Sequence, residues 1–366
     1  MVPMLVIGLQ GSPKKNGSSD FLLKHFLAEV EKMGVDVQTL DIPRMNIRPC
    51  IGCGHCEKTG FCIIDDDDMS ATVYPLLRKA QVVVAASPVF FYSVTSQLKA
   101  LIDRTQALWS RKYRFRLSDP LSTTRKGFFL SMGGSRGKKL FDGIHLVATY
   151  FFDAIDADYS GSLTYPGIET ASDFQKKPDL NLEISKTAHA VMSSLLARKR
   201  ILFLGRHDDI RIRMARALIQ HHAGSRFHVV ATGNEPAQAI EELRSGQKAS
   251  RPAQKPALTL RHAKHSRTAE PTGDARTVAV HPGVMEAMAE IGIDMAFLQP
   301  QSRSNAIQEY RPDIIVTMGD DIEIPAIPNI TTSIWNLPDP RHASFELIVK
   351  LREQIRENVI RLTTDR

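Results

Sequence analysis

The sequence has only four cysteines among 366 residues, and none lies beyond Cys62. A disulfide framework distributes its cysteines along a chain, so their confinement to residues 50–62 argues against one. Clustered cysteines instead indicate a metal site or thiol redox chemistry. The same absence leaves the rest of the chain without a thiol nucleophile.

Long hydrophobic runs are also missing. No apolar stretch reaches the roughly 18 residues needed to cross a bilayer. Residues 1–8 are apolar, but they lack the basic start and the small-residue cleavage site of a signal peptide. We therefore expect a cytoplasmic protein without a membrane partner, in a compartment where thiols stay reduced.

Aromatic residues are absent from the most basic stretch of the chain, residues 248–276. This stretch contains much of the excess of Lys and Arg over Asp and Glu that gives the chain its net charge of +7. Proteins that bind single-stranded nucleic acids stack bases on aromatic side chains, and this stretch offers none. It is also rich in proline and polar residues. We predict a solvated, flexible insertion over 244–277 and no nucleic-acid partner.

Strand and helix patterns alternate along the remainder of the chain. Continuous apolar runs such as 4–9 are typical of parallel strands covered on both faces, and residues 21–33 have helical apolar spacing. Further strands are expected over 35–40, 82–87 and 127–132, and helices over 97–108, 142–154 and 181–200. The pattern restarts with a strand at 200–205, a helix at 212–222 and further elements over 278–292, 312–318 and 345–362. The predicted fold class is α/β, with two doubly wound parallel-sheet domains over 1–196 and 197–366.

A polar loop, Gly-Ser-Pro-Lys-Lys-Asn-Gly-Ser-Ser at 11–19, follows the first predicted strand. Ligands of open α/β sheets bind at this carboxyl edge, and the start of the next helix favours a phosphate. The serine hydroxyls and the charge of Lys14 suit the same ligand. A generic polar turn with a capping serine explains this loop equally well.

An aromatic loop, Ser-Pro-Val-Phe-Phe-Tyr-Ser at 87–93, follows another central strand. Aromatic side chains beside a phosphate loop suit a flat ring system. The alternative is plain core packing of Phe90 and Phe91.

Together these segments resemble the NAD(P)H-dependent FMN reductase family of flavodoxin-like proteins. The resemblance covers residues 1–196 and rests on 11–19, 87–94 and Gln-Leu-Lys-Ala-Leu-Ile-Asp-Arg at 97–104; the glycine loop 133–137 matches a third flavin loop only loosely. It implies that the first loop holds the FMN phosphate and the second the isoalloxazine ring. The residues so assigned to FMN are Ser12, Lys14, Asn16, Ser18, Ser19, Pro88, Val89, Phe90, Phe91, Tyr92 and Ser93.

The four cysteines form a compact set, Cys50-x2-Cys53-x2-Cys56-x5-Cys62. Four thiolates at such spacing can bind one [4Fe–4S] cluster or one zinc ion. The spacing and the following residues 63–69 resemble iron–sulfur flavoproteins, which implies a cluster that relays electrons to FMN. Oxidation-labile thiols, or a cysteine loop near the flavin without a cluster, are the alternatives. The acidic run 65–68 is expected to be a solvated turn and helix start.

Residues 197–366 resemble the low-molecular-weight tyrosine phosphatase and arsenate reductase family, whose signature is a strand, Cys-x5-Arg and a helix. Matching segments include 201–204, 231–237, 280–288, 290–294 and 335–340. Gly205 stands at the position of the nucleophilic cysteine, although Arg211 and Asp339 match the anion-binding arginine and the general acid. Glycine has no side chain to attack with, and carboxylates at 208 and 209 would repel an oxyanion. We predict a catalytically inactive domain that serves as a binding module for a ligand or as a dimerisation and packing element. A metal site is one interpretation of its histidines His207, His221, His222 and His228, but we expect them to be scattered surface residues.

The predicted function is an FMN-dependent oxidoreductase that passes electrons from NAD(P)H, or from a ferredoxin-like carrier, to a small-molecule acceptor. The alternative is a redox or anion sensor in which the flavin or cluster state controls partner binding by the inactive domain. The resemblance of the first half further implies a homo-oligomer, either a dimer or a tetramer.

Overall fold

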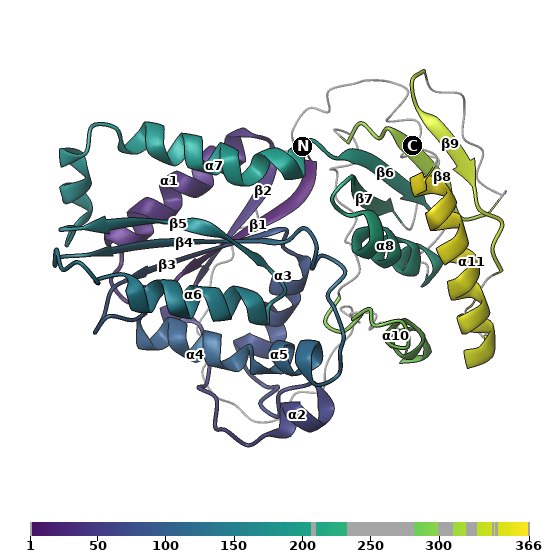
Figure 1. The fold of residues 1–366 in the computed structure, drawn as a ribbon, viewed down its shortest axis with the longest axis horizontal. Coiled ribbons are helices and arrows are strands. Elements are labelled where there is room, and N and C mark those ends of the chain that lie inside the picture. Colours follow the sequence, from purple (N-terminus) through teal and green to yellow (C-terminus); the bar gives the residue numbers. More distant parts are fainter. Residues whose placement is uncertain are drawn as a thin grey trace, which may run out of the picture.

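Two parallel sheets organise the chain (Figure 1). The computed structural model describes residues 2–205, 210–232, 282–298, 310–319, 328–338, 340 and 343–364. The first sheet has the strand order β2-β1-β3-β4-β5, and the second has the order β7-β6-β8-β9. The neighbouring strands of both sheets pair in parallel, so the predicted α/β class with two parallel-sheet domains is confirmed.

The strands of the first sheet are β1 (Val2–Gln10), β2 (Val35–Asp41), β3 (Val82–Pro88), β4 (Lys126–Gly133) and β5 (Asp158–Pro166). Helices α1 (Ser18–Lys32) and α7 (Leu180–Leu196) cover one face. The other face is covered by α3 (Tyr74–Lys79), α4 (Ser96–Arg104), α5 (Gln106–Tyr113) and α6 (Asp142–Ala154). Each face has its own buried apolar cluster because β1, β3 and β4 present apolar side chains to both sides.

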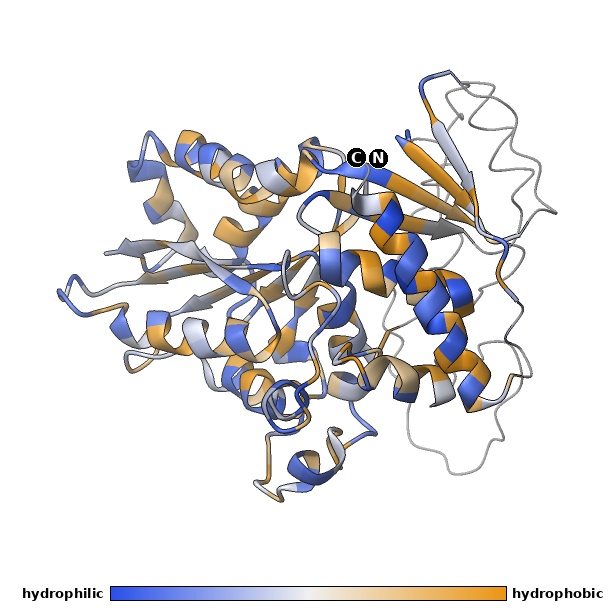
Figure 2. Cartoon of the chain, turned by 45° about the vertical axis from the view of Figure 1, so that its right-hand side comes forward, coloured by the Kyte–Doolittle hydropathy of each residue, from blue (hydrophilic) through white to orange (hydrophobic). Residues whose placement is uncertain are grey.

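The second sheet consists of β6 (Lys199–Leu204), β7 (Phe227–Thr232), β8 (Ile314–Thr317) and β9 (Thr331–Ile334). Helices α8 (Ile210–Ala223), α10 (Pro282–Ala289) and α11 (Phe345–Thr364) share one buried apolar cluster with β6 and β8. Figure 2 shows the hydrophilic residues of α11 on its outer side. The predicted boundary at 196/197 lies between α7 and β6 and stays a prediction.

Several predicted elements need correction. The single helix expected over 97–108 is two helices, because Thr105 Oγ1 bonds the Ile102 carbonyl at 2.6 Å and ends α4. The helix expected over 181–200 already ends at Leu196. Strands β5, β7 and β9 had no counterpart in the prediction. Strands β5 and β9 have largely exposed or half-exposed side chains, so the apolar signal that marks the central strands is absent there.

The first half also contains short helical segments: a 3-10 turn at Ile42–Arg44, α2 (His55–Thr59) within the cysteine segment, and a π-helical turn at Met69–Val73. A further 3-10 turn spans Ala171–Lys176. Within the described part of the chain, no helix is both long and apolar enough to cross a membrane.

Candidate functional site

The candidate phosphate loop, residues 11–19, follows the carboxyl end of β1 and leads into α1, which begins at Ser18. Gly11 N–H donates to the Ala86 carbonyl at 2.8 Å, and a Cβ at Gly11 would lie 2.9 Å from that same oxygen. Only glycine fits this approach of two strand ends. The loop is therefore held against β3, beside the aromatic loop.

The residues predicted to bind the phosphate differ in their exposure to solvent. Ser12, Ser18 and Ser19 are buried, whereas Lys14 and Asn16 are exposed. The extended Gly17 precedes α1 without a side-chain cap, and the first N–H groups of a helix have no partner within it. These N–H groups, the neighbouring serines and the charge of Lys14 can bind an anion.

The aromatic loop is a two-residue hairpin. Phe90 and Ser93 exchange backbone hydrogen bonds of 2.9 Å each, and Phe91 and Tyr92 between them have φ of 49° and 59°. Two central residues with positive φ define a type I′ turn, which normally favours Asn and Gly. Non-glycine residues kept in this conformation point to a functional constraint.

The alternative of core packing for this loop is wrong. Phe90 is half exposed and Phe91 fully exposed, and Tyr92 is also exposed. Tyr92 lies beside the glycine loop 133–137, since a Cβ at Gly137 would be 3.6 Å from its hydroxyl. The aromatic side chains are thus available to a ligand, although their predicted role towards FMN stays a prediction.

Thr95 joins the two loops and was missed by the sequence prediction. Its fully buried hydroxyl donates to the Gly11 carbonyl at 2.5 Å and also accepts from Leu98 N–H at the start of α4. Ser87, at the end of β3, accepts from Thr95 N–H at 3.2 Å. A threonine just before an apolar-periodic stretch is a helix N-cap signal, and this signal could have identified Thr95.

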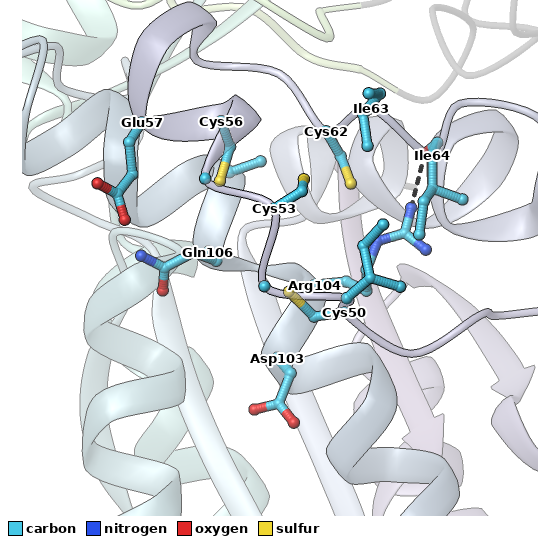
Figure 3. Close-up of a pocket in the computed structure, with 14 residues that line it drawn as sticks. Cys50, Cys53, Cys56, Glu57, Cys62, Ile63, Ile64, Asp103, Arg104 and Gln106 are labelled. Atoms are coloured by element: carbon cyan, nitrogen blue, oxygen red, sulfur yellow. Dashed lines mark hydrogen bonds between the residues drawn. The ribbon is translucent and has the colours of Figure 1, made fainter.

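All four cysteines line one pocket of about 380 Å³, shown in Figure 3. Cys50 and Cys53 are exposed, Cys56 and Cys62 are half-buried, and none is in a disulfide. Burial raises the pKa of the Cys56 thiol, and the nearby Cys62 raises it further. The segment packs against α5 and the end of α4, which supply the pocket's other wall.

The backbone around the cysteines is shaped by three glycines in the left-handed region, Gly52, Gly54 and Gly60, with φ of 67°, 68° and 75°. A Cβ at Gly52 or Gly54 would meet nothing within 4 Å, so the loop has open space there. Among the described residues, no three cysteine, histidine or acidic side chains are gathered closely enough to hold a metal ion. The donor set and the open loop suit a sulfur-ligated metal centre, but the thiols would have to converge on it.

The sequence suggested that the acidic run 65–68 is solvated, and this is wrong for Asp67. Asp67 is buried and pairs with Arg104 at the end of α4, with 2.6 Å between Oδ2 and Nη1. Burial opposes the charged carboxylate, yet the bonds from Arg104 and from Arg48 N–H hold the pKa of Asp67 below its usual value. Tyr74 completes this cluster by donating its hydroxyl to the Arg104 carbonyl at 2.6 Å.

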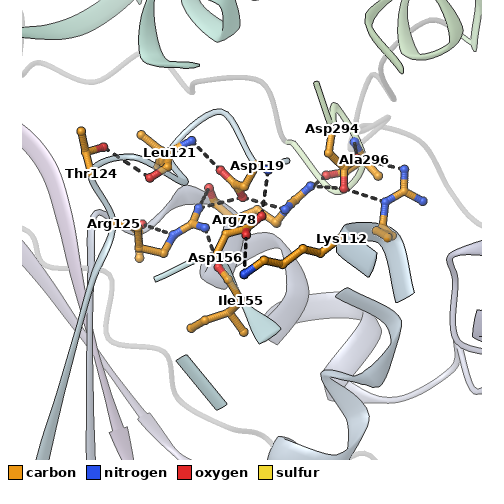
Figure 4. Close-up of polar contacts among 12 residues, drawn as sticks. Arg78, Lys112, Asp119, Leu121, Thr124, Arg125, Ile155, Asp156, Asp294 and Ala296 are labelled. Carbon is orange, nitrogen blue, oxygen red and sulfur yellow. Dashed lines mark hydrogen bonds and ion pairs between the residues drawn. The ribbon is translucent and has the colours of Figure 1, made fainter. Parts of the chain in front are cut away.

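A second buried charge network joins the two halves of the chain (Figure 4). Asp294, just after α10, binds Arg111 of α5 through two hydrogen bonds of 2.7 and 2.9 Å, and Arg78 of α3 at 2.5 Å. Arg78 also pairs with Asp119 at 2.7 Å. Three residues further on, Phe297 packs on Phe61 and Tyr74, with ring centroids 5.3 and 4.9 Å apart. The second half therefore contacts the cysteine segment directly.

In the second half, Gly205 directly follows β6 and is buried, and Arg211 at the start of α8 donates to the Leu337 carbonyl at 2.7 Å. Asp339, residues 206–209 with His207, and the insertion predicted over 244–277 lie outside the described residues. The prediction of surface histidines is wrong for His228, which is 4% exposed on β7. Burial first, and then Arg198 and Arg216, lower its pKa well below the usual value.

Comparison with known proteins identifies the first half. A family model described as NADPH-dependent FMN reductase matches residues 4–148. An iron–sulfur flavoprotein of Methanosarcina thermophila is 33% identical over 145 residues, which are 39% of this chain and 71% of that protein. The chain belongs to the iron–sulfur flavoprotein family. A further iron–sulfur flavoprotein, MJ1083 of Methanocaldococcus jannaschii, is 35% identical over 106 residues, so the chain spans about half of its length, 53%.

These matches support an NAD(P)H-dependent, FMN-dependent oxidoreductase and the predicted resemblance of the first half. A solved structure described as an arsenate reductase in its oxidized state is also similar, at a TM-score of 0.30 and 19% identity, and covers 46% of this chain and 98% of that one. This similarity is too low to carry an argument about the second half.

Proposed function

We propose that the chain binds FMN between the phosphate loop and the aromatic loop, binds a [4Fe–4S] cluster on its four cysteines, and moves electrons between them. NAD(P)H or a ferredoxin-like carrier would be the donor, and a small molecule would be the acceptor. The observation that carries this proposal is that one helix, α4, has one end in each site. Thr95 caps it at the flavin loops, and Arg104 ends it in the wall of the cysteine pocket.

The residues present fit FMN. The start of α1, with Ser12, Ser18 and Ser19, supplies donors for the phosphate, and Lys14 adds positive charge. The exposed hairpin over 90–93 offers aromatic surface and backbone groups for the ring. When bound, FMN supplies the redox chemistry, whereas these residues hold and orient it.

The cysteine segment fits a cluster by its donor chemistry. Four thiols in no disulfide face one pocket, on a loop whose glycines leave open space. Iron–sulfur clusters are held by four cysteine thiolates in this way. Along the axis of α4 the two sites are separated by about 14 Å, from nine residues at 1.5 Å each. Electrons could pass between them within one chain.

The test is an anaerobic purification followed by assays of flavin, iron and sulfide. We expect about one flavin and about four irons per chain. Flavin without iron would overturn the cluster, and the absence of both would overturn the whole proposal. Replacing Ser12, Lys14, Ser18 and Ser19 together by Ala should abolish flavin retention while iron stays bound; stoichiometric FMN in this variant would contradict the assignment of the phosphate loop.

For the second half we propose a catalytically inactive phosphatase-like domain. Gly205 directly follows the central strand β6, at the place where that family carries its nucleophile, and Arg211 donates to the Leu337 carbonyl. A phosphate monoester and arsenate should therefore remain unconverted by the purified protein. If either substrate is turned over, the variant Arg211→Ala decides the source of the activity. Turnover that persists in this variant would come from a contaminant, whereas turnover that is lost in it would refute the proposed inactivity of the domain.

A sensor is the second candidate, favoured by the contact between the two halves. Phe297 packs on Phe61, next to Cys62, and Asp294 is bound by Arg111, whose guanidinium lies 4.8 Å from the centre of the Phe61 ring. Any rearrangement of the cysteine segment would reach the second half through these residues. Rapid turnover with NAD(P)H and a generic acceptor favours the enzyme. Absent turnover, together with protease protection of residues 282–298 that changes with redox state, favours the sensor.

A further inference from the structure

Arg104 occupies an unusual position at the end of α4. Its side chain is completely buried, and its two terminal nitrogens make four hydrogen bonds. Nη1 donates to the Arg48 carbonyl at 2.8 Å and to Asp67 at 2.6 Å, and Nη2 donates to the Ile64 carbonyl at 2.8 Å and to Asp67 at 3.3 Å.

The two carbonyls bracket the cysteines. Arg48 stands two residues before Cys50, and Ile64 stands two residues after Cys62. The guanidinium of Arg104 therefore joins the entry and the exit of the cysteine segment. This contact closes the segment into a loop and fixes it to α4.

One donor of this guanidinium is unused. Nε of Arg104 is buried and has no hydrogen-bond partner, while the residue lines the cysteine pocket. A buried charged donor without an acceptor is costly and is rare in folded proteins. Its position in the wall of a pocket lined by four thiols indicates an acceptor in that pocket.

The acceptor that the surroundings favour is an anionic sulfur. Burial disfavours the charge of Arg104, but Asp67, Tyr74 and the nearby Cys62 together hold the pKa of the guanidinium above its usual value. Cys62 and Arg104 line the same pocket, so a thiolate at Cys62 would share that pocket with this cation. Figure 3 shows the Cys62 side chain on the same side of the pocket as the guanidinium.

We propose that Arg104 is a positioning residue whose Nε–H donates a hydrogen bond to a sulfur of the centre held by the four cysteines. This inference rests on the cluster of the proposed function. Reduction adds an electron and therefore a negative charge, which a buried cation and donor stabilise. Arg104 would raise the reduction potential of the cluster in addition to holding its loop.

The test uses the full chain, anaerobically prepared, in the variant Arg104→Lys, which keeps the positive charge but lacks Nε. The matched control is Arg125→Lys, because Arg125 is also completely buried and paired with an aspartate, Asp119, outside the cysteine pocket. Iron and sulfide content are measured first, and the cluster midpoint potential is then titrated with electron paramagnetic resonance. We expect a more negative potential for Arg104→Lys with the irons retained, and an unchanged potential for Arg125→Lys.

An unchanged potential in iron-loaded Arg104→Lys, or an equal shift in both variants, would overturn the proposal. If Arg104→Lys does not fold, the wild-type protein labelled with 15N-arginine decides: a hyperfine coupling from nitrogen to the reduced cluster supports the bond, and its absence refutes it. Two failures can be told apart. Wild-type protein without iron would refute the cluster, whereas iron-loaded protein whose potential does not change in Arg104→Lys would refute only the role of Arg104.

Discussion

Arg104 and Asp67 form an ion pair in which both side chains are completely buried, with 2.6 Å between Nη1 and Oδ2. The pair joins the end of α4 to the acidic run that follows the cysteines. Removing one partner of a buried pair leaves an uncompensated charge, which is far more costly than losing an exposed pair. The contact therefore decides both the local stability and the shape of the cysteine pocket.

Asp67→Asn should lower the free energy of unfolding by about 3–5 kcal/mol at neutral pH, measured by urea denaturation. Asp66→Asn is the control, because Asp66 is 74% exposed and pairs with Arg48, which is 45% exposed; about 0.5 kcal/mol or less is expected there. The pKa of Asp67 is lower in the folded state than in the unfolded chain. The stability that Asp67 contributes is therefore fully present at a pH above the pKa of the unfolded chain, and it is lost as the pH falls through the lower pKa of the folded state. Similar losses in both variants would contradict the role of Asp67.

Thr95→Val should weaken FMN binding and cost about 2 kcal/mol of stability, since it removes the bond to the Gly11 carbonyl and the cap of α4. Thr95→Ser keeps the hydroxyl and serves as the control. Titration with FMN, followed by flavin fluorescence, measures the affinity. Equal affinity in the valine and serine variants would show that Thr95 does not position the phosphate loop.

Phe91→Gly should leave the stability unchanged or raise it by about 1 kcal/mol, because glycine adopts the positive φ of 49° without strain. The fully exposed ring makes no core contact that the change would remove. Flavin affinity should nevertheless fall if the ring contacts the isoalloxazine. A loss of several kcal/mol in thermal or urea unfolding would instead place Phe91 in a core of an assembled protein.

His228 should make the second half sensitive to mild acid. Its pKa is lowered by burial and then by Arg198, Arg216 and Arg200, so the folded state keeps the ring neutral. Below about pH 6.5 the unfolded state binds a proton that the folded state does not, and stability falls by about 1.4 kcal/mol per pH unit. His228→Leu should reduce this slope between pH 7 and 5.5, whereas His189→Gln, on the exposed side of α7, should not.

Phe297→Ala should loosen the cysteine segment without unfolding either sheet. The change removes the ring packed on Phe61 and Tyr74. Amide hydrogen exchange over residues 50–64 should increase, and cluster iron should be lost faster to a chelator. Leu347→Ala, on the exposed side of α11, is the control; equal exchange in both variants would show that the second half does not support this segment.

The sequence predicted the elements whose signal is burial on both faces. The apolar runs predicted β3 and β4 to within a residue and β1 to within two residues, and α6 has the bounds that were predicted. Strands β5 and β9 escaped because edge strands need only one apolar face, and much of their side chains is exposed.

The candidate sites could be predicted where their chemistry depends on residues that are close together in the sequence. The spacing of the cysteines and the serine loop are local patterns. Asp67 and Arg104, however, are 37 positions apart, and nothing in the run 65–68 distinguishes the one aspartate that is buried. The contact of Asp294 with Arg111, 183 positions apart, depends on how the two halves pack, which periodicity does not report.

Because α4 is a continuous helix between its cap at Thr95 and its end at Arg104, it fixes a register between the two sites. Adding one residue to it would turn Arg104 by about 100° around the axis and move it about 1.5 Å along it. The guanidinium would then leave the carbonyls of Arg48 and Ile64 and face another side of the helix. Insertions that a surface loop absorbs are thus excluded from α4, whose length in residues is part of the design of both sites.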